Sequence, residues 1–521
     1  MDNNQTAIEQ NGHRPKFITE LIGDDFTKWS CGDKIILRAG TGTGKSTFCI
    51  ETLGRYCIET NEKVLYICNR SALEKDVYAR LEKVAQTEPR IKEHVFITKY
   101  QNVESDIRML KEKKVEAEIA EYKYIFLDEC HYFVSDAAMN PYTEVTYNIF
   151  TQCTSAILIF ASATANMFFN AIQKDYSIPE ENIYKIKQDY DFVDNVYTYS
   201  KEQLIPIIQY IIQTEPDSKL VVFCKDGNRI MEIYRYFEEP LTSVFCSSGY
   251  SDKRVKEIAD KRALGDGTFE KRILVTTSVI DNGVDFKDLR IKHIFTELVA
   301  MDSLIQSLGR KRPISSEDHC NYYVREYETE EVRKFRSPGR IQLAMANSFK
   351  NAPTAFRVAH QHDRELYNNS KIIYRDFGAD DDKINEMAYI KYKSNDEMYK
   401  WYIMYGFKNV LKRAMSEQLA EKVKKIELPD YEDNFMDYLI SIEGVKYYKK
   451  DTGVVKKEFE NAMAKIGKFT RWFGMGTLNK FIEERYGGIY KKRFESKRDT
   501  RRVNGDGSPN PMYGKTYWVL K

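Results

Sequence analysis

Residues 39–46 read Ala-Gly-Thr-Gly-Thr-Gly-Lys-Ser, and they follow directly on the apolar run at 35–37. A strand that enters a glycine-rich turn ending in Lys-Ser is typical of a phosphate-binding loop, because backbone N–H groups can close on an anion where a helix begins. Lys45 can reach the β- and γ-phosphates of a nucleoside triphosphate, and the hydroxyl of Ser46 can bind Mg²⁺. The stretch therefore predicts a triphosphate-binding loop between a strand and a helix.

The length and composition indicate a globular chain of several domains. With 521 residues, of which 42% are hydrophobic and 30% charged, the chain has room for about three or four domains of ~150 residues. No run approaches the ~18 apolar residues needed to span a bilayer, and the polar N-terminus lacks the apolar core of a signal peptide. The nine cysteines form no Cys-x-x-Cys pair, which favours reduced thiols and a cytoplasmic location.

The net charge of +2 hides an asymmetry along the chain. Residues 461–521 contain 14 Lys and Arg against five Asp and Glu, a surplus of nine, so the other 460 residues carry a net charge of −7. A basic end on a mildly acidic body indicates a chain that binds a polyanion through that end.

Short apolar strands alternate with helical stretches in two successive parts of the chain. The expected strands of the first part are 34–38, 64–67, 94–98, 124–128 and 156–161. Those of the second part are 220–224, 243–246, 273–276 and 293–296. Strands that alternate with helices predict βαβ units and a parallel sheet, so we expect two α/β lobes facing each other across a cleft.

The same pattern divides the chain into four parts. They are a triphosphate-binding lobe at 1–190, a second lobe at 191–330, a mainly helical accessory region at 331–455 and a basic C-terminal module at 456–521. In the last part, helical stretches precede two strand-like segments, 490–493 and 513–520, which flank a Gly- and Pro-rich turn. A helix pair followed by a β-hairpin predicts a winged-helix-like module.

A second motif supplies the carboxylates that a triphosphate site needs. The apolar residues 124–127 end in Asp128-Glu129, which predicts a buried strand that delivers both carboxylates to the ligand-binding edge of a sheet. Asp128 can hold Mg²⁺, and Glu129 can polarise a water for attack on the γ-phosphate. The alternative is a solvated acidic pair at an ordinary strand end, and the phosphate-binding loop upstream disfavours it.

Three further blocks carry hydroxyl, acidic and basic groups. The first is Ser-Ala-Thr at 162–164, the second is the strand and Gly/Asp turn at 273–285, and the third is Gln-Ser-Leu-Gly-Arg-Lys-Arg at 306–312. Arginines of the third block can reach phosphate charge from the second lobe. Taken alone, the first block also fits a strand-to-loop turn, and the third block also fits a basic surface patch.

In this order the five blocks resemble motifs I, II, III, V and VI of the superfamily 2 helicases, in the DExH-box branch, with Asp-Glu-Cys-His at 128–131. The resemblance covers about residues 30–320. It implies an α/β fold with two tandem RecA-like lobes built on parallel sheets. It also implies that ATP and Mg²⁺ bind between these lobes.

The resemblance implies a role for each matching residue. The implied catalytic residues are Glu129, Lys45, Arg310, Arg312 and Gln306. The implied nucleotide contacts are Ala39, Gly40, Thr41, Gly42, Thr43, Gly44, Lys45, Ser46, Thr47 and Asp285. The implied Mg²⁺ ligands are Ser46 and Asp128, and the residues implied to couple hydrolysis to lobe movement are His131, Ser162 and Thr164. Arg310 matches the arginine finger. The family's second arginine comes three residues later, where this chain has Pro313, and Arg312 stands one position early as its substitute.

Weaker matches indicate contacts to a nucleic-acid backbone. Residues 69–73, 97–101 and 222–225 resemble motifs Ia, Ib and IV. In the family these positions contact phosphates without reading bases. The contacts that they imply, together with motif V, are Arg70, Thr98, Lys99, Lys225 and Thr276.

The basic tail offers a second surface for nucleic acid. Seven Lys and Arg residues lie between Tyr490 and Tyr513, among them Lys492, Arg493 and Arg498. Cations can bind phosphates, and the aromatic rings beside them can stack on bases. The alternative is a solvated charged face over a small aromatic core; the helicase resemblance upstream favours nucleic-acid binding.

Together these features predict an ATP-dependent nucleic-acid helicase or translocase that moves along one strand. DNA is favoured over RNA, because residues 281–285 and 309–312 resemble helicases of phages and other bacterial mobile elements and because the tail has a winged-helix order. Replication or repair proteins in a bacterial or phage-infected cell are then the expected partners. Two alternatives stay open, a remodelling or clamping ATPase that does not unwind, and an RNA helicase.

Overall fold

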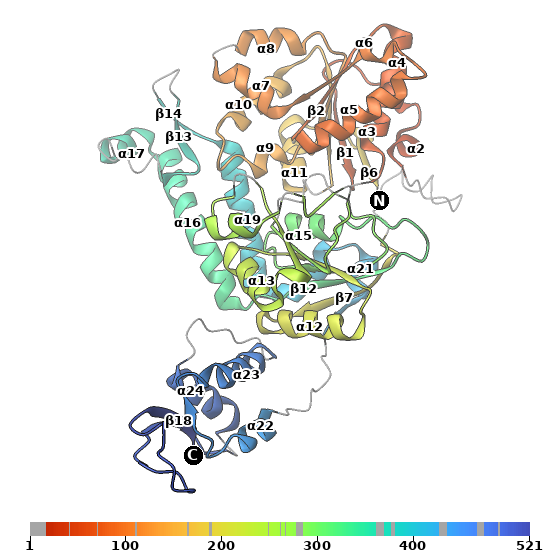
Figure 1. Cartoon of the computed structure of the whole chain (residues 1–521). Helices are drawn as coiled ribbons and strands as arrows, with labels where there is room; N and C mark the ends of the chain where they lie inside the picture. Colours follow the sequence, from red (N-terminus) through yellow and green to blue (C-terminus); the bar gives the residue numbers. More distant parts are fainter. Residues whose placement is uncertain are drawn as a thin grey trace.

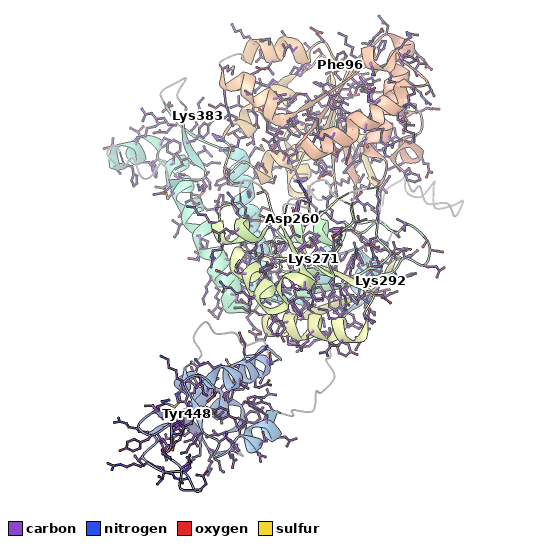
Figure 2. All side chains as sticks on the ribbon, in the orientation of Figure 1. Phe96, Asp260, Lys271, Lys292, Lys383 and Tyr448 are labelled. Atoms are coloured by element: carbon purple, nitrogen blue, oxygen red, sulfur yellow. The ribbon has the colours of Figure 1, made fainter. Side chains whose placement is uncertain are left out.

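The structure, a computed structural model, shows two α/β lobes, a helical arm and a C-terminal module (Figure 1). It describes residues 17–521 except 41, 70, 110–111, 164–165, 187–189, 248–249, 261, 266, 278–284, 361–368, 377–380, 427–434, 466–473 and 488–489. Figure 2 shows Phe96 in the first lobe, Lys383 on the arm and Tyr448 in the C-terminal module. Among the described helices, none is both long enough and apolar enough to cross a bilayer.

The first lobe is built on a six-stranded parallel sheet in the order β3-β2-β4-β5-β1-β6. Alternate strand residues face two separate cores, so that Ile35 and Leu37 enter one core and Ile36 enters the other. The strands are β1 (Lys34–Ala39), β2 (Val64–Cys68), β3 (Val95–Lys99), β4 (Tyr124–Asp128), β5 (Ile157–Ser162) and β6 (Ile183–Ile186). The first five match the expected strands. The sixth, β6, was not predicted, because it is a short edge strand that contains the polar Lys185.

Helices cover both faces of this sheet (Figure 1). The phosphate-binding loop continues into α3, then into a π-helical turn at Phe48–Leu53 and then into α4. The helices are α2 (Ile18–Ile22), α3 (Lys45–Thr47), α4 (Gly54–Thr60), α5 (Ser71–Ala85), α6 (Ile91–His94), α7 (Tyr100–Arg108), α8 (Glu112–Ile119), α9 (Tyr132–Ser135), α10 (Tyr142–Gln152) and α11 (Asn166–Tyr176), with 3-10 turns at Asp25–Thr27 and Glu180–Asn182.

The second lobe has a seven-stranded parallel sheet in the order β15-β7-β12-β11-β8-β10-β9. Its strands are β7 (Val193–Tyr199), β8 (Lys219–Phe223), β9 (Thr242–Phe245), β10 (Ile273–Thr276), β11 (Ile291–Thr296), β12 (Cys320–Arg325) and β15 (Val423–Lys425). Its helices are α12 (Leu204–Thr214), α13 (Gly227–Leu241), α14 (Lys253–Ile258) and α15 (Met301–Leu308), with a 3-10 turn at Lys201–Gln203. The sequence predicted four of these strands, and the two tandem parallel α/β lobes are confirmed.

A helical arm lies along both lobes (Figure 1). Its two long helices run antiparallel, since Lys350 pairs with Glu386 and Arg336 pairs with Asp396. The arm consists of α16 (Thr329–Asn351), α17 (Pro353–His360), β13 (Ile373–Asp376), β14 (Asp381–Ile384) and α19 (Glu386–Tyr405), followed by α20 (Phe407–Ala414) and α21 (Glu417–Glu421).

Helix α19 contributes to the cores of both lobes. Met387 and Ala388, at its N-terminal end, are buried with residues of the first lobe, whereas Tyr402 is buried in the core of the second. Hydrogen bonds support both ends: Asn385 donates to the carbonyl of Ala137, and the Tyr402 hydroxyl donates to the carbonyl of Val299. One helix therefore joins the two lobes.

The C-terminal module has its own hydrophobic core. Three helices precede an antiparallel β-hairpin, and the last two of them followed by the hairpin give the order that the sequence predicted. The first strand of the hairpin lies at 494–498 and not at the predicted 490–493. The elements are α22 (Phe435–Ser441), β16 (Tyr447–Tyr448), α23 (Thr452–Lys465), α24 (Met475–Tyr486), β17 (Phe494–Arg498) and β18 (Thr516–Leu520). Leu439 and Ile442 belong to this core, so the module extends N-terminal to residue 456.

Candidate ATP and nucleic-acid sites

The phosphate-binding loop lies at the carboxyl end of β1, the sheet edge where ligands of parallel α/β folds bind. Gly42 and Gly44 have φ angles of 82° and 86°, in the left-handed region that favours glycine. The hydroxyl of Thr43 donates to the carbonyl oxygen of Gly40 at 2.7 Å, and α3 begins at Lys45. The loop therefore opens its backbone toward the start of a helix.

Lys45 joins this loop to the acidic end of β4. Its Nζ lies 2.9 Å from Oε1 of Glu129 and 3.7 Å from Oδ1 of Asp128. It also donates to the carbonyl oxygen of Ala39 at 3.4 Å. All three charged side chains are largely buried, so one lysine partly neutralises two carboxylates at the sheet edge.

The two carboxylates differ in their surroundings. Burial raises the pKa of Asp128 above its usual value, although the charge of Lys45 opposes that rise. Burial alone would also raise the pKa of Glu129, but the charges of Lys45 and His131 hold it well below its usual value. Glu129 therefore stays ionised at neutral pH, as a residue that polarises water must. Its φ of 48° is an uncommon conformation for a non-glycine residue.

His131 links Glu129 to the end of β5. Its Nδ1 lies 3.0 Å from the hydroxyl of Ser162 and 3.3 Å from Oε2 of Glu129. The Ser162 hydroxyl in turn donates to the same Glu129 oxygen at 3.4 Å. Two of the three predicted coupling residues thus meet around the predicted general base, while Thr164 lies outside the described residues.

Two arginines of the second lobe share one acidic partner. Arg312 Nε lies 3.2 Å from Asp285 and Arg310 Nη1 lies 3.9 Å from it. Arg312 also reaches the first lobe, because a Cβ built on Gly42 would lie 3.4 Å from its Cζ and Nε. The structure therefore places Arg312, the off-register substitute, against the phosphate-binding loop, and it places Asp285 beside the arginines.

Helix α15 faces the Asp-Glu-Cys-His segment from the second lobe. Asp302, in its first turn, interacts electrostatically with His131 of the first lobe. Desolvation raises the pKa of Asp302 to about 6, and the charge of His131 acts in the opposite direction. Gln306 lies one helical turn after Asp302, so it projects from the same face of α15.

Thr47, a predicted nucleotide contact, has a partner within the protein. The hydroxyl of Thr47 accepts a hydrogen bond from Arg80 at 2.8 Å, on the side of the helix that faces α5. Ser46 follows Lys45 in the first turn of α3. Thr41 and Arg70 lie outside the described residues.

The predicted nucleic-acid contacts of the lobes are mostly engaged with protein. Lys99 pairs with Glu74 at 3.4 Å, and Lys225 Nζ lies 3.4 Å from the ring centroid of Phe335. The side chain of Thr276 is fully buried and donates to the carbonyl of Thr277, so its contact with a phosphate stays a prediction that needs another conformation.

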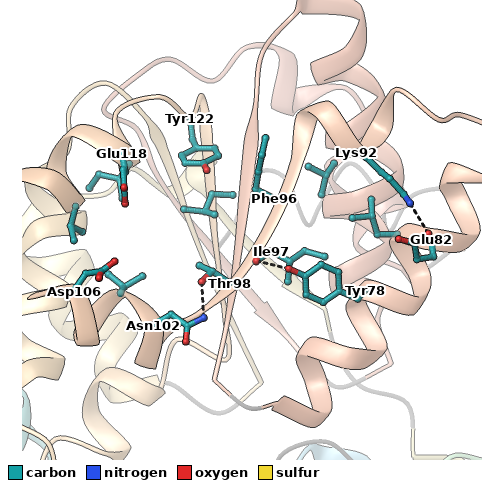
Figure 3. A pocket seen from close by; sticks show the side chains of 16 residues that line it. Tyr78, Glu82, Lys92, Phe96, Ile97, Thr98, Asn102, Asp106, Glu118 and Tyr122 are labelled. Carbon is teal, nitrogen blue, oxygen red and sulfur yellow. Dashed lines mark hydrogen bonds and ion pairs between the residues drawn. The ribbon is translucent and has the colours of Figure 1, made fainter.

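Thr98 lines a pocket of about 440 Å³ on the first lobe (Figure 3). The pocket lies over the edge strand β3, between α5 on one side and α7 and α8 on the other. Thr98 accepts a hydrogen bond from Asn102 there, and Tyr78 donates to the carbonyl of Ile97. This pocket is separate from the phosphate-binding loop.

The three predicted nucleic-acid contacts of the C-terminal module lie on its hairpin or just before it. Arg493 and Arg498 are exposed, and Arg498 Nε donates to the carbonyl of Gly514 at 2.8 Å. Lys492 forms an ion pair with Glu443. At the base of the hairpin loop, Asp499 accepts hydrogen bonds from Lys446 and Tyr448, both at 2.7 Å, which fixes the loop to the module.

Sequence reasoning missed Phe17 beside the phosphate-binding loop. Phe17 is 49% exposed, and a Cβ built on Gly44 would lie 3.6 Å from its ring. The N–H of Ile18 donates to the carbonyl of Thr43 at 2.9 Å, which anchors this segment to the loop. An isolated aromatic in a polar N-terminal stretch gives no periodic signal. Trp29 also precedes the loop in the sequence, but it is a core residue that packs on Phe48 and Tyr184.

The residues at this site fit ATP and Mg²⁺. Glycines with positive φ leave the loop backbone open to phosphate oxygens, and Lys45 and Arg312 add positive charge from two lobes. The Ser46 hydroxyl and the Asp128 carboxylate are the hard oxygen ligands that Mg²⁺ prefers.

Two stacked parallel α/β lobes with a phosphate-binding loop, an acidic strand end and arginines from the second lobe define a two-lobed P-loop ATPase. Residues 16–167 match the family described as "Type III restriction enzyme, res subunit", and residues 202–312 match the "Helicase conserved C-terminal domain". The chain thus carries the two ATP-dependent helicase domains that these two descriptions name.

Comparison with solved structures gives matches of low identity, with TM-scores below 0.5. The Escherichia coli DExH-box NTPase HrpB matches with 12% identity and a TM-score of 0.41, over 61% of this chain and 42% of its own. Saccharomyces cerevisiae Dbp5 bound to RNA and ADP BeF3 matches with 12% identity and a TM-score of 0.41, over 57% of this chain and 79% of its own. Mss116p bound to ssRNA and AMP-PNP matches with 15% identity and a TM-score of 0.42, over 68% of this chain and 85% of its own.

Proposed function

We propose that this protein is a DNA helicase or translocase that couples Mg-ATP hydrolysis between its lobes to movement along one strand. The observation that carries the proposal is the position of Arg312, in the second lobe, beside Gly42 of the phosphate-binding loop in the first. A triphosphate site completed by both lobes responds to a change in their separation, which is what a motor requires.

The chain's own residues divide the work of hydrolysis. Lys45 and the backbone of 39–46 bind the phosphates, and Ser46 and Asp128 would hold Mg²⁺, which supplies charge neutralisation at the reacting phosphate. Glu129 takes the proton of the attacking water, and His131 and Ser162 orient its carboxylate. Arg312 stabilises the charge that develops in the transition state, with Arg310 beside it.

The grip on nucleic acid is assigned to the C-terminal module. Its surplus of cations supports nucleic-acid binding, and its helix pair followed by a hairpin, the order of a winged-helix module, favours DNA over RNA. The resemblance of 281–285 and 309–312 to helicases of phages and mobile elements points the same way, with replication or repair proteins as partners. Because Leu439 and Ile442 share its core, we define the module as residues 435–521.

Strand displacement tests this function. Purified protein is given partial duplexes of DNA and of RNA, with single-stranded tails of either polarity, and ATP turnover and displaced strand are measured together. We expect stimulated hydrolysis and displacement on DNA, and loss of both in Lys45→Ala. Hydrolysis that no nucleic acid stimulates would reject the motor, whereas stimulation without displacement would support a clamping or remodelling ATPase.

The module's role has its own test. Deletion of 435–521 should weaken DNA affinity and flatten its dependence on salt, because fewer counterions are released on binding. The matched control removes a negative charge from the same hairpin at Glu495, which pairs with Lys497. Glu495→Gln should preserve or strengthen binding.

A further inference from the structure

Asp128 has a buried neighbour that lies outside the sequence motifs. Tyr66, in the middle of β2, is fully buried, and its hydroxyl donates a hydrogen bond to Oδ2 of Asp128. β2 lies directly beside β4, and Tyr66 stands in register with Phe126. Their rings stack with centroids 5.4 Å apart and planes at 6°. Since strand side chains alternate, Asp128 projects from the same face as Phe126, one pleat further on.

The two oxygens of Asp128 are therefore held by different groups. Oδ1 accepts the backbone N–H of Glu129 at 3.0 Å and lies 3.7 Å from Nζ of Lys45. Oδ2 accepts the phenol of Tyr66. A carboxylate with a fixed partner on each oxygen keeps one orientation, and here that orientation turns Oδ1 toward the phosphate-binding loop.

Packing alone does not account for the hydroxyl of Tyr66. A phenylalanine would stack on Phe126 equally well, and a buried hydroxyl without an acceptor is destabilising. The hydroxyl of Tyr66 has that acceptor in Oδ2 of Asp128, so it serves the carboxylate as a hydrogen-bond donor.

We propose that Tyr66 is a positioning residue for the divalent cation of the ATP site and that it acts through Asp128. The inference rests on the proposed function, because it takes Asp128 as a ligand of that cation. Tyr66 touches neither the nucleotide nor the cation; it holds the carboxylate in the orientation that binds metal.

Metal affinity, measured apart from activity, tests the proposal. Mn²⁺ is titrated into the protein–ADP complex and followed by electron paramagnetic resonance, for wild type and Tyr66→Phe. We expect Mn²⁺ to bind about tenfold more weakly to Tyr66→Phe, since a hydrogen bond to a charged group is lost. Binding of ADP without metal should stay within about twofold, because the phosphate-binding loop keeps its own donors.

Tyr100→Phe is the matched control. Its hydroxyl donates to the backbone carbonyl of Asp128 at 3.1 Å, and it is equally buried, but it does not touch the carboxylate. Its Mn²⁺ affinity should equal that of wild type. Equal Mn²⁺ affinity of Tyr66→Phe and wild type, or equal losses in Tyr66→Phe and Tyr100→Phe, would overturn the proposal.

A double-mutant cycle separates positioning from general destabilisation. If Tyr66 acts through Asp128, Tyr66→Phe should weaken Mn²⁺ binding no further in an Asp128→Asn background; a full additional loss there contradicts the proposal. Melting temperatures of the metal-free variants report whether each one folds. Failure of the wild type itself to bind Mn²⁺ with ADP would reject the ATP site, and so the proposed function, rather than the role of Tyr66.

Discussion

The guanidinium of Arg312 lies 3.4 Å from where a Cβ on Gly42 would stand, so an arginine of the second lobe lies beside the phosphate-binding loop of the first. The two residues are 270 positions apart in the chain. No side chain could occupy position 42 without displacing this arginine or straining a backbone with φ of 82°. The effects that we expect for substitutions around the ATP site follow from this arrangement.

Arg312→Ala should lower kcat for ATP by about 10³-fold with a smaller change in KM, because an arginine finger acts mainly on transition-state charge. Arg310→Ala removes the neighbouring guanidinium on the same acidic partner, Asp285, and we expect a smaller loss. Single-turnover hydrolysis with saturating nucleic acid measures both. A larger loss in Arg310→Ala would reverse the assignment of the finger.

Glu129→Gln should bind ATP with near-normal affinity and hydrolyse it at least about 10²-fold more slowly, since the amide cannot accept the proton of the attacking water. Lys45 would keep a hydrogen-bond acceptor in place of its ion pair at 2.9 Å. Equilibrium binding of a fluorescent ATP analogue and steady-state hydrolysis check the two parts. Retained turnover would remove Glu129 from the role of general base.

Phe17→Ala should raise KM for ATP by about tenfold and leave kcat nearly unchanged. The exposed ring beside Gly44 offers a stacking surface to the base of a nucleotide whose phosphates lie in the loop. Phe17→Trp, which keeps an aromatic face, serves as the control and should bind ATP at least as well as the wild type. An unchanged KM in Phe17→Ala would exclude the ring from the nucleotide site.

Glu144→Gln should stabilise the protein at pH 8 and leave it unchanged near pH 4. Glu144, on α10, accepts the backbone N–H of Glu386 at the start of α19, and burial raises its pKa to about 7. In the unfolded chain the carboxyl ionises near 4.5, so the folded state holds the proton more tightly and the free energy of unfolding falls as pH rises from about 4.5 to 7.

Glutamine keeps the acceptor for Glu386 and carries no charge, so the variant should gain up to about 2 kcal/mol at pH 8. Chemical denaturation at several pH values measures the difference between variant and wild type. A pH dependence as steep in Glu144→Gln as in wild type would show that another group causes it. Glu386→Gln, which leaves the backbone N–H in place, is the control for the local change in charge.

Local patterns predicted the parts of the ATP site that lie within one strand and its following loop. The loop at 39–46 and the pair Asp128-Glu129 were evident because apolar strands lead directly into them. The position of Arg312 beside Gly42 could not be predicted, since only the folded structure shows which of two nearby arginines lies next to the loop.

Contacts between distant segments left no signal in the sequence. In the sequence Tyr66 is an ordinary strand residue. Its hydrogen bond to Asp128 depends on β2 and β4 being neighbours in the sheet. β15 joins the second sheet from more than 200 residues beyond β7, after a long helical arm. The burial of Thr276 could not be predicted either, because a hydroxyl at a strand end looks exposed in a sequence but is buried here.

Helix α19 has a consequence for how the protein unfolds. Its 20 residues, about 30 Å of helix, supply Met387 to one lobe's core and Tyr402 to the other's. Melting either lobe would strip apolar partners from the remaining one, so the folding of the two lobes is thermodynamically coupled. Two lobes with separate sheets should therefore unfold in a single cooperative transition. The C-terminal module has its own core, so calorimetry should show its unfolding as a separate transition.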